Sequence, residues 1–165
     1  MTTGQLGGLL CQHDLIILEG CDGVGKTTLA EELSARHGYM IVHAARTPDG
    51  TDLFAKYSAV LERPGPLVLD RSFPSELVYG PLDHGRSRLT LVDVLRLAAT
   101  AADRGGILVH LTGQPDVIAA RLQVRDGHAP SVQRIRVLTA AYARVVSSLA
   151  NQIPVITIDT TTAAG

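Results

Sequence analysis

Gly20-Cys21-Asp22-Gly23-Val24-Gly25-Lys26-Thr27 is the stretch of this 165-residue chain that decides its fold. It has the pattern G-x-x-x-x-G-K-[ST] and lies between an apolar run, residues 15–19, and a segment of helical spacing that starts at Lys26. The glycines let successive backbone N–H groups point inward around an anion, and the N-terminus of a helix adds partial positive charge. The pattern therefore predicts a phosphate-binding loop between a strand and a helix, with an ordinary glycine-rich turn as the alternative.

Short β-branched or leucine-rich runs recur along the chain, each bounded by Gly, Pro or Asp. We expect five strands, at Leu15–Glu19, Tyr39–His43, Leu67–Asp70, Ile107–Leu111 and Val155–Ile158. Helical spacing predicts helices between them, at Lys26–His37, Asp52–Leu61, Ser75–Tyr79, Leu89–Asp103, Pro115–Arg125 and Val132–Leu149. Strands that are apolar on both faces need helices on each side, so the alternation predicts a doubly wound α/β fold with a five-stranded parallel sheet. Ligands of such a sheet bind beyond the carboxyl ends of its strands.

Composition limits the classes of protein to which the chain can belong. It is 45% hydrophobic and carries a net charge of -1, which argues against binding nucleic acid by bulk electrostatics. No unbroken apolar run approaches the roughly 20 residues that cross a bilayer, so no membrane partner is expected. Two cysteines are too few for a disulfide framework, and no Cys/His cluster has the spacing of a zinc site.

These observations predict a cytoplasmic protein with one domain. We expect that domain to span residues 14–160, between a flexible N-terminal tail of residues 1–13 and a C-terminal tail of residues 161–165.

Four residues in and after the loop are typical of phosphoryl-transfer sites. Lys26 is placed to reach the β- and γ-phosphates of a nucleotide, and the hydroxyl of Thr27 to ligate Mg²⁺. Leu67–Asp70 is an apolar strand that ends in a carboxylate, so Asp70 is expected to hold the same ion, with Arg71 at the mouth of the cleft. The alternative is that Asp70 only caps the turn after the strand.

Arg121 and Arg125 are four residues apart on the helix predicted after the fourth strand, so their guanidinium groups share one face. Two like charges at this spacing repel each other, and an anion between them relieves the repulsion. In a phosphoryl transferase they would close over the transferring group and stabilise its oxygens. The alternative is a solvated basic face that Asp126 partly compensates.

Together these residues resemble the thymidylate kinases, a family of P-loop nucleoside monophosphate kinases. Glu19–Thr28 is similar to the family's E-G-x-[DE]-G-x-G-K-[ST]-T, Arg46–Thr51 to R-E-P-G-G-T, and Asp70–Tyr79 to D-R-x-x-x-S-x-x-x-Y. Leu111–Arg125 resembles the strand, helix and R-x-x-x-R lid, and Ile158-Asp159 the end of the last strand. The resemblance implies a three-layer P-loop kinase fold, ATP and Mg²⁺ as cofactors, and a nucleotide as the phosphoryl acceptor.

The same resemblance implies roles for individual residues, with a lid around residues 121–131. Contacts to the donor nucleotide are implied for Gly20, Asp22, Gly23, Val24, Gly25, Lys26, Thr27 and Thr28. Contacts to the acceptor are implied for Asp22, Arg46, Phe54, Arg71, Ser75, Glu76 and Tyr79. Metal ligation is implied for Thr27 and Asp70, and catalysis for Lys26, Asp70, Arg71, Arg121 and Arg125.

The chain departs from the family pattern between Gly50 and Leu67, where too few residues remain for the two helices that grip thymine. Phe54 is the expected substitute for the aromatic residue of those helices. Glu76 stands where relatives often carry an amide or a small polar residue facing the base. Because an ionised carboxylate only accepts hydrogen bonds, the preferred base should offer a donor, such as a pyrimidine N3–H.

Gly80–Arg88 lies outside the family pattern and resembles segments of kinase-like proteins of bacterial viruses, which suggests a shortened member of that type. Its glycines, proline and arginines predict a loop that holds the acceptor phosphate or the backbone of a larger acceptor. The alternative is a surface loop whose Ser87 caps a helix starting at Arg88.

We expect an enzyme that moves the γ-phosphoryl group of ATP to a deoxynucleoside monophosphate, such as dTMP. One alternative acceptor is a nucleoside or a hydroxymethylated base in DNA, and a third interpretation is a non-catalytic nucleotide-binding module. A GTPase would need the motif N-K-x-D, which the chain lacks. A homodimer through the apolar face of Leu89–Ala99 is a further expectation, with burial of that face in the chain's own core as the alternative.

Overall fold

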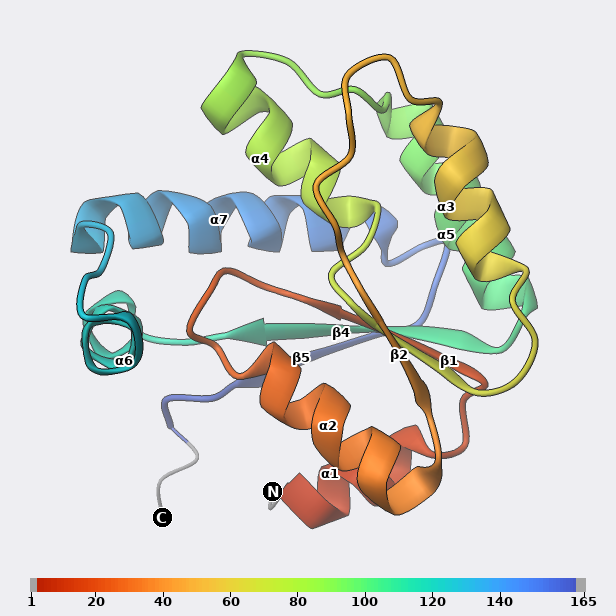
Figure 1. Ribbon diagram of the computed structural model, residues 1–165, viewed down its shortest axis with the longest axis horizontal. Helices are drawn as coiled ribbons and strands as arrows, with labels where there is room; N and C mark the ends of the chain where they lie inside the picture. Colours follow the sequence, from red (N-terminus) through yellow and green to blue (C-terminus); the bar gives the residue numbers. More distant parts are fainter. Residues whose placement is uncertain (1–2, 163–165) are drawn as a thin grey trace.

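The computed structural model describes residues 3–162 and confirms the five-stranded parallel sheet. The strands lie in the order β2 (Met40–His43), β3 (Leu67–Asp70), β1 (Leu15–Glu19), β4 (Gly106–Thr112) and β5 (Val155–Asp159). Every adjacent pair is parallel, so all five carboxyl ends meet at one edge (Figure 1). The predicted strand bounds differ from these by one residue at most, because the apolar runs are bounded by turn residues.

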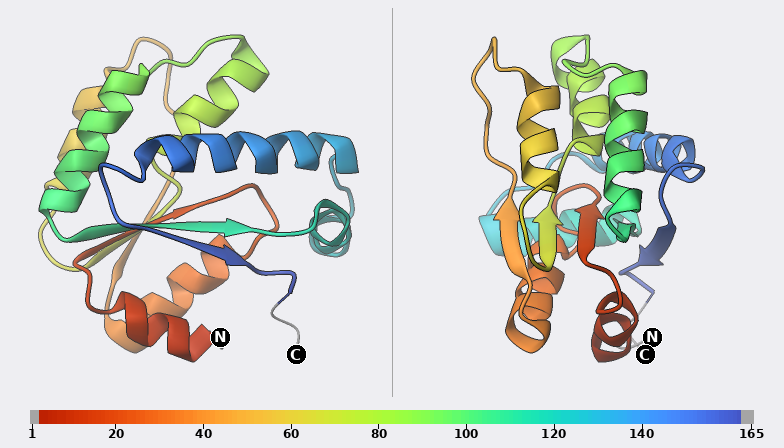
Figure 2. Two further views of the ribbon diagram at one scale, coloured as in Figure 1. Left: turned by 180° about the vertical axis from the view of Figure 1, so that it is seen from behind. Right: turned by 90° about the vertical axis from the view of Figure 1, so that its right-hand side faces the viewer.

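Helices cover both faces of the sheet, which gives the three layers of a doubly wound fold (Figure 2). One face carries α1 (Thr3–Leu10) and α2 (Lys26–His37). The other face carries α3 (Leu53–Leu61), α4 (Pro74–His84), α5 (Leu91–Asp103) and α7 (Val132–Leu149). The remaining helix, α6 (Pro115–Asp126), lies beyond the carboxyl end of β4 (Figure 1).

The core forms because β1 is buried on both of its faces. Ile16 and Leu18 join an apolar cluster that includes Leu33 of α2. Their neighbours Leu15 and Ile17 point the other way and join the cluster beneath α3 and α5. Side chains alternate along a strand, so consecutive apolar residues can serve two layers at once. The phosphate-loop motif therefore starts directly after a strand that is buried on both faces.

The expectation of a flexible tail over residues 1–13 is wrong for the part that the structure describes, because residues 3–10 form α1. Leu6 and Leu10 are four residues apart, share one helical face and are buried. The hydroxyl of Tyr39 donates to the carbonyl groups of Leu10, at 3.2 Å, and His13, at 2.5 Å, which fixes the end of the helix. Residues 1 and 2 and residues 163–165 of the two expected tails lie outside the described residues.

The segment expected as a loop, Gly80–Arg88, is helical over its first half, since α4 continues to His84. Gly80 permits this arrangement because a Cβ there would lie 2.6 Å from the Cα of Ser87, which folds back against the helix. The helix expected to start at Arg88 starts at Leu91, because Thr90 and Asp93 form a capping box. The hydroxyl of Ser87 accepts instead from the N–H of Leu89 and donates to the carbonyl of Glu76.

Most of the apolar face over Leu89–Ala99 packs inside the chain itself. Val94, Leu97 and Ala98 are fully buried in the cluster beneath α5. Leu91 and Val92, at the start of the helix, are the large apolar side chains of this segment that remain exposed. The alternative of burial in the chain's own core therefore holds for most of this face. Within residues 3–162, no helix combines the length and the apolar character needed to cross a membrane.

Candidate active site

The phosphate loop has the backbone conformation that its motif predicts. Gly20 adopts φ +145°, and a Cβ at this position would lie 2.2 Å from the carbonyl oxygen of Leu111, so no other residue fits there. Gly25, at φ +91°, precedes the first turn of α2, which has no side-chain cap. The N–H groups at this helix start are therefore left for a ligand, and their partial positive charge favours an anion.

Lys26 holds a buried ammonium group inside the loop. Its Nζ donates to the carbonyl oxygen of Cys21 at 2.7 Å, and the residue is only 6% exposed. Burial lowers the pKa of Lys26, and the nearby guanidinium of Arg71 lowers it further. A cation in this position is most favourable when an anion lies in the loop, which is the role predicted for Lys26 with a nucleotide phosphate.

Thr27, in the first turn of α2, meets Asp70 at the carboxyl end of β3. The hydroxyl of Thr27 donates to Oδ2 of Asp70 at 2.8 Å, and Nδ1 of His43 lies 3.2 Å from the same oxygen. These hydroxyl and carboxylate oxygens are suitable ligands for Mg²⁺, which usually keeps several waters and phosphate oxygens as well. Within residues 3–162, no group of three or more His, Cys, Asp or Glu side chains is arranged to hold a metal ion.

The phosphate-loop pocket, as we call the cavity at this point, has a volume of about 260 Å³. It is lined by Asp22, Gly23, Gly25, Lys26, Thr27, Thr28, His43, Ala44, Asp70, Arg71 and Arg125. All of these except His43 and Ala44 were predicted from the sequence. His43 was missed, although the end of β2 lies in register with Asp70 and so had to reach the same edge. Gly20 and Val24 support the loop from behind without lining this pocket.

Arg71 follows Asp70 directly and adopts φ +65°, which is the sole positive φ of a non-glycine residue between residues 3 and 162. Its guanidinium pairs with the carboxylate of Asp22 and donates to the hydroxyl of Tyr79 at 3.3 Å. It also lies 5.1 Å from the centre of the Tyr79 ring. Arg71 thereby faces both the phosphate-loop pocket and a second cavity beneath α4.

This second cavity, the arginine pocket, has a volume of about 570 Å³. Its walls come from the segment after β2, from α3, from the turn after β3 together with α4, and from the turn before α5. The lining residues are Ala44, Ala45, Arg46, Thr47, Asp49, Tyr57, Arg71, Ser72, Ser75, Glu76, Tyr79, Gly80, His84, Arg86 and Arg88. The structure thus brings Arg46, Arg71, Ser75, Glu76 and Tyr79 together, as the sequence predicted for an acceptor site.

The arginines of this pocket differ in how firmly they are held. Arg88 donates to the carbonyl of Thr47 at 3.0 Å and lies 3.6 Å from Oε1 of Glu76. Arg46 and Arg86 make no hydrogen bond or ion pair with any other residue that the structure describes. Two guanidinium groups are therefore open to an anionic ligand, while Arg88 holds the loop in place.

Phe54, expected to contact the acceptor, does not line the arginine pocket. It lies under the guanidinium of Arg96 on α5, 4.7 Å from it. The reason is the helical period, because the buried stripe of α3 is Leu53, Tyr57 and Leu61, which turns Phe54 to the side. Tyr57 lines the pocket in its place and donates its hydroxyl to Glu76 at 3.2 Å.

A third cavity, the apolar pocket, adjoins the phosphate loop on its other side and has a volume of about 520 Å³. It shares Gly23, Gly25, Thr28 and Arg125 with the phosphate-loop pocket. Its other lining residues are Leu6, Val24, Leu29, Leu111, Arg121, Leu122, Ile158 and Thr160. Leu6 was not predicted to line a site, because its segment was expected to be a flexible tail.

The two predicted lid arginines lie on α6 but have different surroundings. Arg121 donates to the carbonyl and the hydroxyl of Thr160, at 2.7 and 3.0 Å, beside the apolar pocket. Arg125 pairs with Asp126 and lines both the apolar and the phosphate-loop pockets. Arg125 is thus the one that reaches the predicted phosphate site.

Solved structures share the fold of this chain. The YorR protein of Bacillus subtilis, in complex with phosphorylated GDP, is 28% identical and has a TM-score of 0.77, with 88% of this chain and 85% of that one covered. A deoxyadenosine kinase from M. mycoides with bound dCTP has a TM-score of 0.58 at 15% identity, with coverage of 88% and 90%. Shikimate kinase from Acinetobacter baumannii has a TM-score of 0.53 at 16% identity, with coverage of 92% and 86%.

The last two likenesses show the P-loop kinase fold alone, because their identity is so low. Among curated proteins, none is significantly similar to this chain. A family model, that of the AAA domain, does match, and it covers residues 16–140. Since this match spans most of the chain, the protein belongs to the AAA domain family.

Proposed function

We propose that the protein transfers the γ-phosphoryl group of ATP to a deoxynucleoside monophosphate, most favourably a pyrimidine nucleotide such as dTMP. The observation that carries the proposal is the position of Arg71, which lines both the phosphate-loop pocket and the arginine pocket. A guanidinium at the junction of two anion sites can hold the transferring group and the acceptor phosphate at once.

The donor fits the apolar pocket and the phosphate-loop pocket, which share part of their walls. A planar base suits the apolar cavity beside Arg121, and the triphosphate then runs along the N–H groups of the loop to Lys26. Thr27 and Asp70 would hold Mg²⁺, which offsets the negative charge that builds on the phosphate oxygens. The chain's own part is to align and screen these groups.

The acceptor proposed for the arginine pocket carries a phosphate. Four guanidinium groups, those of Arg46, Arg71, Arg86 and Arg88, line the cavity, which suits a doubly charged monophosphate better than an uncharged sugar. A phosphate oxygen is already deprotonated at neutral pH, so the attacking group needs no general base. Glu76 would accept a hydrogen bond from an N–H of the acceptor base.

The comparison with YorR supports a nucleotide ligand, since that protein was solved with phosphorylated GDP and is 28% identical to this chain. A guanine and a pyrimidine both offer an N–H to the carboxylate of Glu76, and turnover with each deoxynucleoside monophosphate distinguishes the two.

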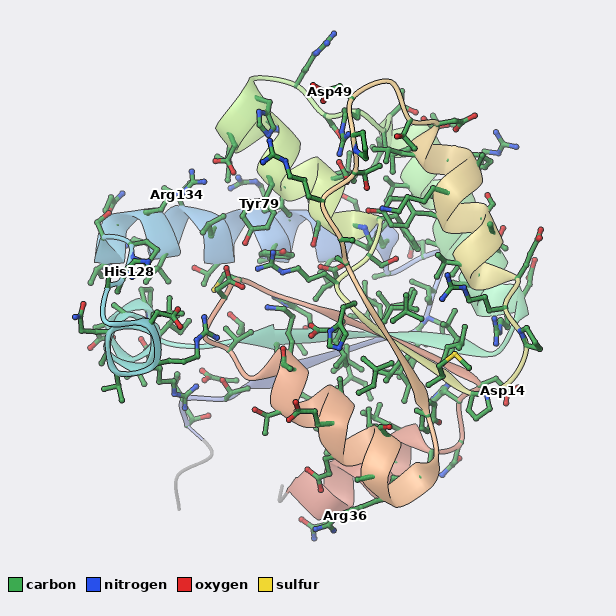
Figure 3. All side chains as sticks on the ribbon, viewed as in Figure 1. Asp14, Arg36, Asp49, Tyr79, His128 and Arg134 are labelled. Carbon is green, nitrogen blue, oxygen red and sulfur yellow. The ribbon has the colours of Figure 1, made fainter. Side chains whose placement is uncertain are left out.

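The test is turnover of Mg·ATP by the purified protein with each deoxynucleoside monophosphate, with thymidine, and with DNA that contains a hydroxymethylated base. We expect phosphorylation of dTMP, and a loss of about 100-fold in kcat/KM for Arg71→Ala. The control is Arg36→Ala, on the far side of α2 (Figure 3), which should leave turnover unchanged. Turnover of thymidine or DNA without dTMP would overturn the acceptor, and tight ATP binding with no turnover at all would indicate a non-catalytic module.

A further inference from the structure

Glu19 is a buried carboxylate at the end of β1, directly before the first glycine of the phosphate loop. Its Oε1 accepts a hydrogen bond from the backbone N–H of Ser72 at 2.8 Å. Its Oε2 accepts one from the hydroxyl of Ser75 at 2.7 Å. Both donors belong to the segment that leads from β3 into α4. A single side chain of β1 therefore holds the chain where it leaves β3.

The position of Glu19 costs free energy, because a buried carboxylate loses its hydration. Burial raises its pKa from 4.5 to about 7, although the hydrogen bonds from Ser75 and Ser72 act in the opposite direction. The other four residues of β1 are apolar and fully buried, so an apolar residue would be the cheaper choice for the core. The hydrogen bonds of Glu19, and not its packing, therefore account for a carboxylate at this position.

The backbone segment that Glu19 holds contains the strained residue Arg71. Arg71 has the left-handed φ of +65°, which costs a non-glycine residue on the order of 1–3 kcal/mol unless its surroundings enforce it. Two hydrogen bonds flank this conformation. The N–H of Arg71 donates to the carbonyl of Leu18 at 3.1 Å, and the next N–H, that of Ser72, donates to Glu19. Residues at the end of β1 thus fix the peptide groups on both sides of the Arg71 Cα.

The same hydrogen-bond network also supports the side chain of Arg71, through Ser75 and two tyrosines. The hydroxyl of Ser75 lies 3.0 Å from that of Tyr142 on α7. The Tyr142 ring packs edge to face against the Tyr79 ring, with 6.1 Å between centres. Tyr79, which lies between α4 and α7 (Figure 3), is the ring that the Arg71 guanidinium covers. Glu19 therefore supports the backbone of Arg71 through Ser72, and its side chain through Ser75, Tyr142 and Tyr79.

We propose that Glu19 is a positioning residue for phosphoryl transfer, which locks the turn at Arg71 so that its guanidinium reaches both the phosphate-loop pocket and the arginine pocket. The inference rests on the proposed function, because Arg71 matters only if both pockets are filled. Glu19 touches no substrate itself, since it lines neither pocket. Its loss should therefore weaken the acceptor side and leave the donor side largely intact.

The experiment compares acceptor KM, kcat and the Kd of a fluorescent ATP analogue for the wild type, Glu19→Ala and Glu19→Gln. The alanine variant should raise acceptor KM by about tenfold or more and change the donor Kd by less than about twofold. The glutamine variant keeps an oxygen that accepts from Ser72, so it should recover acceptor KM to within about threefold of the wild type. Glu31→Ala, which removes an exposed carboxylate of α2, is the control and should behave as the wild type.

A double-mutant cycle with Arg71→Ala decides whether Glu19 acts through that residue. If it does, Glu19→Ala adds less than about twofold to acceptor KM once Arg71 is absent. Additive losses, or an acceptor KM unchanged in a folded Glu19→Ala, would overturn the inference. Should the alanine variant fail to fold, Glu19→Gln takes its place in the cycle, and additivity there counts equally against it. A wild type that phosphorylates no nucleotide would instead contradict the proposed function.

Discussion

The phosphate-loop pocket and the arginine pocket share Arg71, yet they are built in different ways. More than half of the residues that line the first lie in one contiguous stretch, residues 22–28, which follows a strand buried on both faces and presents main-chain N–H groups. The second is made of side chains from four separate segments, and two of its arginines have no partner within the described residues. A main-chain cradle recognises any polyphosphate tail, whereas a side-chain cavity can change its ligand by single substitutions. Specificity for the acceptor should therefore reside in the arginine pocket.

The largest effect on kcat/KM should come from Lys26, the lysine of the phosphate loop. The chain has two lysines, and Lys26→Ala should lower kcat/KM by about a thousandfold with every acceptor, because no other ammonium enters the phosphate-loop pocket. Lys56, which donates to the hydroxyl of Thr47 beside the arginine pocket, is the matched comparison. Lys56→Ala should alter acceptor KM only. Equal losses in steady-state assays of the two variants would remove the distinction between the pockets.

The buried carboxylate of Glu19 should make the free energy of unfolding depend on pH. Folding raises the pKa of Glu19 from 4.5 to about 7, so its protonated form is favoured in the folded state. The associated stability is fully present below pH 4.5 and is lost as pH rises through 7, by an amount on the order of 3 kcal/mol. Urea unfolding at pH 5 and pH 8 measures it. In Glu19→Gln this part of the difference should vanish, and an identical pH dependence in the two proteins would show that Glu19 does not titrate as described.

A smaller effect is expected from the unpartnered arginines. Arg46→Ala and Arg86→Ala should each raise acceptor KM by about tenfold, because each removes one charge-assisted contact to the acceptor phosphate. The donor Kd should stay constant, since neither residue lines the phosphate-loop pocket. Initial rates over a matrix of donor and acceptor concentrations separate the two constants. A change in donor KM alone would mean that Arg46 and Arg86 act on the donor and not on the acceptor.

The smallest effect concerns the donor base. Leu6→Ala enlarges the apolar pocket and should raise KM for ATP by about threefold, with acceptor KM unchanged. Leu9, on the same helix but half exposed, provides the control, because Leu9→Ala leaves the pocket intact. If both variants behave alike in donor titrations, α1 stabilises the fold without shaping a nucleotide site.

The sequence predicts the main-chain pocket almost completely, and the physical reason is locality. The loop, the strand before it and the helix after it are contiguous, so their arrangement follows from turn residues and from apolar periodicity. Asp70 was predicted as well, because parallel strands bring their carboxyl ends to one edge.

The side-chain pocket is less predictable because its walls depend on which face each helix turns inward. Phe54 was expected to contact the acceptor, yet Tyr57, three residues later, lines the pocket instead. The extension of α4 past Gly80 depends on the return of Ser87 against it, which no local pattern reveals. Leu6 escaped notice for a similar reason, since its helix is rich in glycine and is held by Tyr39, far along the chain.

The most direct test of the central claim is calorimetric titration with a bisubstrate analogue, in which adenosine and deoxythymidine are joined through five phosphates, in the presence of Mg²⁺. If the two pockets meet at Arg71 as described, the analogue should bind about 100-fold more tightly than ATP, and Arg71→Ala should remove most of that gain. Binding no tighter than that of ATP, or mutual displacement of ATP and dTMP from a single site, would contradict the account.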